Sequence, residues 1–287
     1  MGLIATTIEE QIQKLLDRGM IIEDVDKAKE ILLDIGYYRL GFYWHHFEID
    51  GDHNFQENLN FMDVVDLYYL DVDLKYILSK AILRIEVNFR TKLLYHGSIN
   101  YKNNNSWYIN KKYINSDILS NLTKIYSKLK DRKTLTHHHT KYKCKHAPAW
   151  KVFEFLTFGQ IMKIYNNIIE EDLKNEIANQ YKIKDYVLLE NYFISIINIR
   201  NICFHHSILY DYNQPIGINK IRSKKYKFIT RNATNLNASI KLILFILSRI
   251  SEDRAAELEL EIRTKIDNSR NNKLLNEIIN THICFDL

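Results

Sequence analysis

The sequence predicts an all-α protein, and three observations support that prediction. The 287 residues include only 8 glycines and 2 prolines, well below the roughly 7 % and 5 % of an average chain. Apolar residues recur at helical spacing along most of the sequence. The sequence has no glycine-rich loop of the kind that cradles phosphates in nucleotide-binding α/β folds. Long helices joined by short polar loops are therefore expected, and a chain of this length can bury about 75 % of its unfolded surface without a disulfide or metal.

The N-terminal part predicts two short helices and an aromatic segment. Apolar spacing indicates a helix over residues 7–20 that ends at Gly19, a natural C-cap. Asp24 precedes a second helical run, which stops at Gly36. The stretch 37–44 is dense in aromatic side chains. Such clusters usually form core or helix-packing surface, with direct ligand contact as the alternative.

The middle of the chain holds its longest helical pattern. Residues 61–95 carry no glycine or proline and predict one long helix or two in close succession. A polar loop is expected over 97–106, a helix over 118–129, and an irregular basic stretch to 146. Pro148 suits the first turn of a helix that we expect to run to Ile169.

The C-terminal part predicts a buried helix followed by three more. Residues 186–199 are apolar nearly all round, as in a central helix. The later helices are expected around 238–250, 255–266 and 273–279. No repeat or composition break marks a boundary, so we expect a single domain over 1–287. Within it, a helical and aromatic segment of about 1–58 should pack on a helical core of about 59–287.

Composition also bears on location. The cysteines are odd in number and widely spaced, which favours reduced thiols. No signal-peptide pattern is present, and the longest apolar run, 240–250, is shorter than the ~18 residues needed to span a bilayer. We expect a cytoplasmic protein with no membrane partner and no cofactor.

The net charge of +5 hides an uneven distribution. Residues 121–147 hold eight basic side chains against one acidic, and residues 218–231 hold six against none. Segregated positive charge is typical of polyanion-binding surfaces, although solvated lysine-rich loops give the same pattern. Tyr142 and Tyr226 lie within these stretches and are expected to offer ring faces to unpaired bases. The predicted RNA-binding residues are Lys141, Lys143, Lys145, Lys220, Arg222, Lys224, Lys225 and Lys227.

The buried helix leads directly into Arg200-Asn201-Ile202-Cys203-Phe204-His205-His206, where we expect the chemistry. A buried arginine keeps its charge and needs an anion. Asn201 and His205 are four residues apart and would share a helix face, whereas Arg200 and His205 lie about 140° apart on an ideal helix. The alternative is a structural arginine paired with Glu154 or Glu190, followed by two capping histidines.

Two further residue patterns have the chemistry of functional sites. Arg90 and His96 have the types needed for a second motif, although Glu86 and Arg90 at i,i+4 more simply form an ion pair. The cluster His137, His138, His139, Cys144 and His146 suggests a metal, but it lacks paired ligand spacing. A basic loop facing RNA is the preferred interpretation, and no metal site is predicted.

Five segments in order along the chain resemble the Abi-like family of bacterial abortive-infection proteins, the AbiD and AbiF group. They are Leu16-x-Arg18-Gly19-Met20, Ile35-Gly36-Tyr37-Tyr38-Arg39-Leu40-x-x-Tyr43-Trp44, Arg84-Ile85-Glu86-Val87-x-x-Arg90, Pro148-x-Trp150-x-x-x-Glu154-x-x-x-Phe158-Gly159 and Arg200-Asn201-Ile202-Cys203-x-His205-His206-Ser207. The last is similar to the RNase motif of HEPN domains. The chain departs from the family over residues 208–212, where two commonly present cations are missing.

This resemblance implies a HEPN-like helical bundle with additional N-terminal and C-terminal helices. It implies a metal-independent endoribonuclease acting in phage defence, in which the ribose 2′-OH attacks the adjacent phosphate. Arg200, Asn201, His205 and His206 would be the catalytic residues, and a homodimer would bring two motifs together. In the alternative, the protein binds RNA without cutting it and holds a structured small non-coding RNA. A third class is a protein-interaction bundle with no nucleic-acid partner.

Overall fold

The computed structural model describes residues 4–205, 207–229 and 233–286. Within these ranges the chain is all-α, with three isolated bridge pairs and no strand. The helices are α1 (Ile8–Asp17), α2 (Val25–Asp34), α3 (Tyr37–Trp44), α4 (Phe61–Asn100), α5 (Ser116–Leu129), α6 (Lys133–Tyr142), α7 (Ala149–Val152), α8 (Phe158–Asn166), α9 (Glu171–Asn179), α10 (Tyr186–Phe204), α11 (Leu236–Ser248), α12 (Glu252–Ser269) and α13 (Lys273–Ile278). Short turns of other helix types are η1 (His45–Phe47), η2 (Trp107–Ile109), η3 (Phe153–Phe155) and η5 (Ile279–Ile283).

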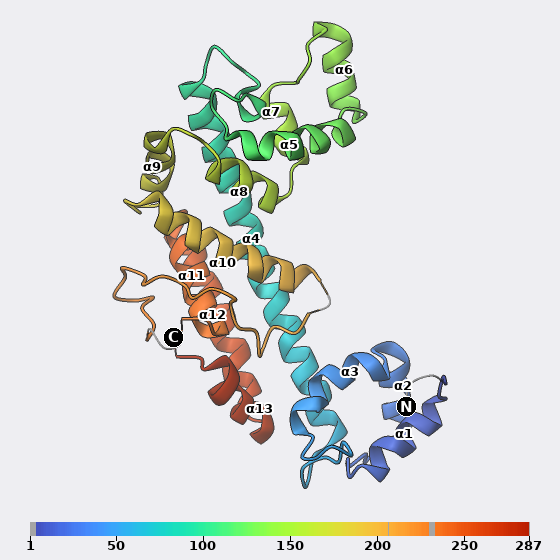
Figure 1. The fold of residues 1–287 in the computed structure, drawn as a ribbon. Helices are drawn as coiled ribbons and strands as arrows, with labels where there is room; N and C mark the ends of the chain where they lie inside the picture. Colours follow the sequence, from blue (N-terminus) through green and yellow to red (C-terminus); the bar gives the residue numbers. More distant parts are fainter. Residues whose placement is uncertain (1–3, 206, 230–232, 287) are drawn as a thin grey trace.

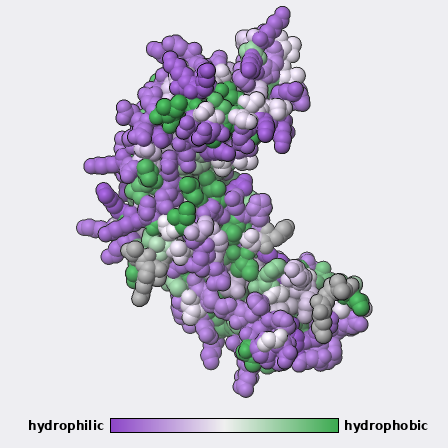
Figure 2. Space-filling model, in the orientation of Figure 1, coloured by the Kyte–Doolittle hydropathy of each residue, from purple (hydrophilic) through white to green (hydrophobic). Residues whose placement is uncertain are grey.

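Helix α4 is the axis of the fold. Its 40 residues span about 60 Å at 1.5 Å per residue. Helices α10, α11 and α12 pack along it, α3 packs near its N-terminal end, and α7, α8 and α9 pack toward its C-terminal end (Figure 1). The molecule is hollowed on one side, between the part built from α5–α7 and the part built from α1–α3 (Figure 2).

The predicted ends of the first two helices are confirmed. Thr7 caps α1 through a capping box with Glu10, which supplies two otherwise unpaired amides with acceptors. Asp24 caps α2 by accepting from the amide of Lys27. Gly19 and Gly36 follow these helices with φ of 90° and 94°, a backbone conformation that favours glycine.

Three sequence-based expectations about helices were wrong. Helix α4 continues through Gly97, which was expected to begin a loop, because Trp107 packs against this glycine. The stretch expected to be irregular forms α6, which buries Leu135 and His138. The helix expected from Pro148 to Ile169 is divided into α7, η3 and α8, because Thr157 starts a new capping box. Helix α9 was not predicted.

The most buried helix is α11. Every residue from 236 to 247 is buried, Lys241 included, and Lys241 Nζ donates to the Lys227 carbonyl at 3.0 Å. Helix α10 is less enclosed than expected, since Val187 and Ile194 are 51 % and 40 % exposed. By length and composition α10 also meets the test for a membrane span. It packs on α4, α8, α9 and α11, as the core helix of a soluble protein does.

Candidate functional site

The predicted motif lies where α10 ends. Helix α10 begins at Asp185, whose carboxylate accepts from the amide of Val187, and it ends at Phe204. His205 is the C-cap, with extended backbone angles of −116° and 170°, and its amide donates to the Asn201 carbonyl at 3.0 Å. The end of α10 reaches the hollow side of the molecule (Figure 1).

Arg200 is a half-buried arginine without an acidic partner in the described chain. Its Nε is buried and has no hydrogen-bond partner. The guanidinium lies over the ring of Phe204, 4.9 Å from the centroid. The alternative in which Arg200 pairs with Glu154 or Glu190 is therefore not observed among the described ion pairs. A desolvated cation with unused donors favours an anion that is absent from the protein itself.

His205 and Asn201 are both exposed. His205 is the C-cap of α10 and not a residue within the helix. The two residues lie together at the helix end, joined through their backbones. The structure thus places Arg200, Asn201 and His205 within about 8 Å along the helix axis, given a rise of 1.5 Å per residue. His206, the fourth predicted catalytic residue, lies outside the described residues.

The segment after the motif is held by Asp71, a fully buried carboxylate in α4. Asp71 Oδ1 accepts from the amides of Leu209 and Tyr210, at 2.8 and 2.7 Å. Asp71 Oδ2 accepts from the hydroxyl of Tyr43 at 2.9 Å and pairs with Lys75 at 2.6 Å. Four donors satisfy this buried charge, which otherwise would be costly. The chain directly after the histidines is therefore fixed to the axis of the fold.

Tyr43 joins the aromatic segment to this anchor. The Arg39 guanidinium donates to the Tyr43 hydroxyl at 3.1 Å, and burial together with the nearby Asp71 raises the pKa of Tyr43 far above its usual value. Sequence reasoning placed these aromatics in the core but missed their link to the motif. The available signal was the i,i+4 pair Asp71 and Lys75 within a long helical pattern.

Cys203 lies within the motif and faces α4. Burial raises the pKa of its thiol to about 12, with Lys75 lowering and Asp71 raising it. A thiol with this pKa stays protonated near neutral pH and is a poor nucleophile. Among the described residues of the motif, the polar side chains available for reaction are therefore those of Arg200, Asn201 and His205.

The possible second motif is engaged in structural contacts. The predicted ion pair between Arg90 and Glu86 is confirmed, at 2.8 Å, and Arg90 also donates to the Leu156 carbonyl at 2.9 Å. His96 Nδ1 lies 2.6 Å from a Glu176 carboxylate oxygen. These contacts join α4 to the start of α8 and to α9.

The two basic stretches lie in separate parts of the molecule (Figure 1). Lys141 and Lys143 are exposed at the C-terminal end of α6, and Lys145 is exposed in the loop that follows. The ring of Tyr142, 57 % exposed, lies 5.2 Å from Lys141 Nζ. The first stretch thus presents cations beside an accessible aromatic ring.

The second stretch runs as a loop beside α10, α11 and α12. Its predicted RNA-binding residues are all exposed: Lys220, Arg222, Lys224, Lys225 and Lys227. Lys225 pairs with Glu259 at 2.8 Å. Tyr226 is only 6 % exposed, so the expectation that its ring faces are open to bases was wrong. Arg231 lies outside the described residues.

The histidines of α6 contact their neighbours. His139 Nε2 lies 2.8 Å from the Tyr126 hydroxyl and its Nδ1 lies 2.8 Å from the Cys144 carbonyl oxygen. His138 Nε2 lies 3.1 Å from Cys144 Sγ. Among the described residues, no group of three or more His, Cys, Asp or Glu side chains is arranged to hold a metal ion.

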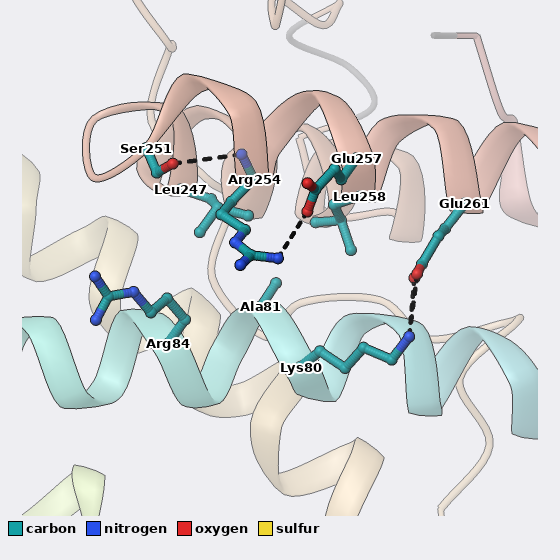
Figure 3. Close-up of a pocket in the computed structure, with 9 residues that line it drawn as sticks. All are labelled: Lys80, Ala81, Arg84, Leu247, Ser251, Arg254, Glu257, Leu258 and Glu261. Atoms are coloured by element: carbon teal, nitrogen blue, oxygen red, sulfur yellow. Dashed lines mark hydrogen bonds and ion pairs between the residues drawn. The ribbon is translucent and has the colours of Figure 1, made fainter.

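A pocket of about 620 Å³ lies between α4 and α12 (Figure 3). Most of its charges pair with one another: Lys80 with Glu261 at 3.1 Å and Arg254 with Glu257 at 2.9 Å. Arg84 extends from α4 at one end of the pocket, with no ion pair to a described residue. The pocket is not lined by any residue of the motif.

Comparison with known proteins gives one match. A family model described as Abi-like protein matches residues 30–211, which is more than half of the chain. No curated protein and no solved structure matches. The matched range begins in α2 and ends just after the Asp71-bound segment. It therefore includes the aromatic segment, α4 and the whole motif.

Proposed function

Because this chain belongs to the Abi-like protein family, whose name points to abortive infection and phage defence, we propose that it is a metal-independent endoribonuclease of the HEPN type. The observation that most directly supports this proposal is Arg200, a half-buried cation at the end of α10 whose Nε has no partner among the described residues. It lies near His205, an exposed histidine. One residue supplies a fixed positive charge and the other an imidazole that can accept or donate a proton.

In the proposed reaction, a ribose 2′-OH attacks the adjacent phosphorus. His205 takes the 2′-OH proton as general base. Arg200 donates to the phosphate oxygens, whose negative charge grows in the transition state. The bond from phosphorus to the 5′ oxygen breaks, and that oxygen receives a proton. The products are a 2′,3′-cyclic phosphate and a 5′-OH, so the reaction needs neither a metal nor added water.

A second copy of the chain would supply the proton for the leaving oxygen. In each chain, the described part of the motif contains one exposed histidine, His205, whereas the reaction needs both a base and an acid. In a homodimer with two facing motifs, His205 of each copy takes one of these roles. Asn201 is exposed beside His205 and would orient the phosphate or the imidazole.

The test is cleavage of single-stranded RNA by purified protein in EDTA, with detection of cyclic-phosphate ends. Arg200→Ala and His205→Ala should each abolish cleavage. Arg249→Ala is a matched control, because Arg249 is also a helix-end arginine with an unpartnered buried Nε and lies over an aromatic ring, Phe245, at 4.7 Å. His137→Ala, at an exposed histidine, controls for His205. Cleavage that requires a metal, or that survives both motif changes, would overturn the proposal.

The second candidate function is RNA binding without cleavage, with a structured small non-coding RNA as partner. It is favoured by the exposed cations beside Tyr142 at the end of α6. Under this function the wild-type protein binds RNA with an affinity that falls steeply with salt, and no cyclic-phosphate ends appear. Lys141→Ala and Lys143→Ala would then weaken binding while Arg200→Ala leaves it unchanged.

A further inference from the structure

An aromatic pocket lies directly beside the segment that follows the motif. It has a volume of about 470 Å³ and is formed by α3 and η1 on one side and residues 208–211 on the other. Its aromatic lining comes from Tyr37, Tyr38, Phe42 and Trp44. This volume lies within the range of small-molecule and nucleotide sites, about 300–1,000 Å³.

Two of these four rings are exposed, whereas Trp44 is buried. Tyr38 is 82 % exposed and Phe42 is 43 % exposed, and their rings pack edge to face at 5.3 Å. Tyr37 and Trp44 form a second edge-to-face pair at 4.9 Å. Neighbouring exposed rings are the surface on which proteins stack unpaired bases.

Polar groups with fixed orientation form the pocket rim. Glu48, whose side chain is 9 % exposed, lies 2.5 Å from the Arg18 guanidinium, 2.8 Å from His45 and 2.7 Å from His53. Asp211 lies 2.9 Å from His282. These pairings hold the rim in one arrangement. His45 and His53 contact Glu48 through Nδ1, so the Nε2 atom of each ring can still bond to the edge of a nucleobase.

The pocket and the candidate site share one anchor. Tyr43, between the pocket residues Phe42 and Trp44, donates to Asp71, and Asp71 also holds the amide of Tyr210, another pocket residue. Tyr210 lies five residues beyond His205 in the sequence. A base in the pocket and a phosphate at Arg200 would therefore be held at a fixed separation.

We infer that this pocket receives one unpaired base of single-stranded RNA and so sets where the strand is cut. The inference rests on the proposed function, because the cut position has meaning only if the motif cleaves RNA. The pocket supplies stacking from Tyr38 and Phe42. Specificity for one base comes from the polar rim.

The test uses fluorescein-labelled RNA of about 12 nucleotides, within the roughly 4–16 typical of a single-strand site. Binding is measured on the His205→Ala protein, and a set of oligonucleotides each carries one abasic position. One abasic position should weaken binding about 10-fold, since stacking of a base contributes about 1–3 kcal/mol. The double variant Tyr38→Ala with Phe42→Ala should bind the intact RNA similarly weakly. In this variant, removing the base at the sensitive position should have no further effect on binding. The Tyr38→Trp variant should still bind the RNA more weakly when the base at that position is missing.

The control is Tyr95→Ala, which removes a tyrosine 62 % exposed near the other end of α4 and should leave the abasic profile unchanged. In the cleaving protein, the cut should fall at a constant offset from the sensitive base. If wild type cuts RNA and the Tyr38 and Phe42 changes alter neither affinity nor cut position, the pocket inference fails and the nuclease stands. If the protein cuts no RNA but one abasic position still weakens binding, the pocket binds a base and the nuclease proposal fails. A change in oligomeric state with unchanged RNA binding would assign the pocket to a second copy and overturn the inference.

Discussion

Asp71 Oδ1 accepts a hydrogen bond of 2.7 Å from the amide of Tyr210, which lies 139 residues later in the chain. The same carboxylate accepts from the Tyr43 hydroxyl, so one buried charge links the aromatic segment, α4 and the segment after the motif. The arrangement of the candidate site therefore depends on Asp71, which takes no part in the proposed reaction.

Tyr43→Phe removes one donor from Asp71 and should lower the free energy of unfolding by about 1.5–3 kcal/mol, the range for a hydrogen bond to a charged group. Asp71→Ala should cost more, about 3 kcal/mol or above, because it leaves the buried Lys75 without its partner. Urea unfolding measures both changes. Tyr95→Phe, at an exposed position, should change stability by less than about 0.5 kcal/mol.

Arg200 and Arg90 should respond in opposite ways to replacement by methionine. Arg200→Met removes an unpartnered, half-buried cation and should leave stability unchanged or slightly higher while abolishing RNA cleavage. Arg90→Met leaves Glu86, whose side chain is 11 % exposed, without its ion-pair partner. This change should lower the free energy of unfolding by about 2 kcal/mol or more. Thermal unfolding of the two variants side by side decides this. A large loss of stability in Arg200→Met would mean that Arg200 has a structural anion partner.

Gly97→Ala should destabilise the protein by about 1–3 kcal/mol through overpacking. A Cβ at this position would lie 2.5 Å from the ring of Trp107, which is fully buried. Gly159→Ala is the matched control, since no atom lies within 4 Å of its Cβ position. That change should be neutral or stabilise α8 by up to about 1 kcal/mol. Denaturant titration compares the two, and equal effects would contradict the close approach at Gly97.

Glu48 should make stability depend on pH. Burial opposes its ionisation, but hydrogen bonds from His53, His45 and Arg18 hold the pKa of Glu48 below its usual 4.5. A lowered folded pKa means that this contribution is present above about pH 4.5 and is lost as the pH falls through the folded value. Glu48→Gln should therefore cost about 1–2 kcal/mol at pH 7. The gap to wild type should close as the pH falls below 4.5 and through the folded pKa of Glu48, as measured by unfolding at each pH. A gap that stays constant with pH would show that the ionised carboxylate is not the stabilising form.

Local sequence signals predicted most helices and the location of the motif. Thr7, Asp24 and Pro148 each lie at a helix start, because capping chemistry is local. The break before α8 carried such a signal in Thr157 and Gln160, a capping box that the apolar spacing masked. Helix α6 was missed because its basic and histidine residues have little amphipathic pattern, and it is held by burial of Leu135 and His138.

What local patterns do not specify is which distant groups meet. The partners of Asp71, the burial of Tyr226 and the lack of an acidic partner for Arg200 among the described residues all depend on how α3, α10 and the C-terminal loops pack around α4. The position of the motif at the end of a long apolar helix was predictable from its residues. Its surroundings, including the aromatic pocket, required the tertiary structure.

The contact between Asp71 and residues 209–210 also bears on synthesis of the protein. Chains emerge from the ribosome N-terminus first and fold in domain-sized units as they appear. Residues 8–204 can leave the tunnel with α4 complete while Asp71 still lacks its backbone partners. The motif becomes anchored only after residues 209–210 have emerged. A growing chain therefore holds this segment unanchored until most of the protein has been translated, and truncated products that end before residue 209 lack the anchor altogether.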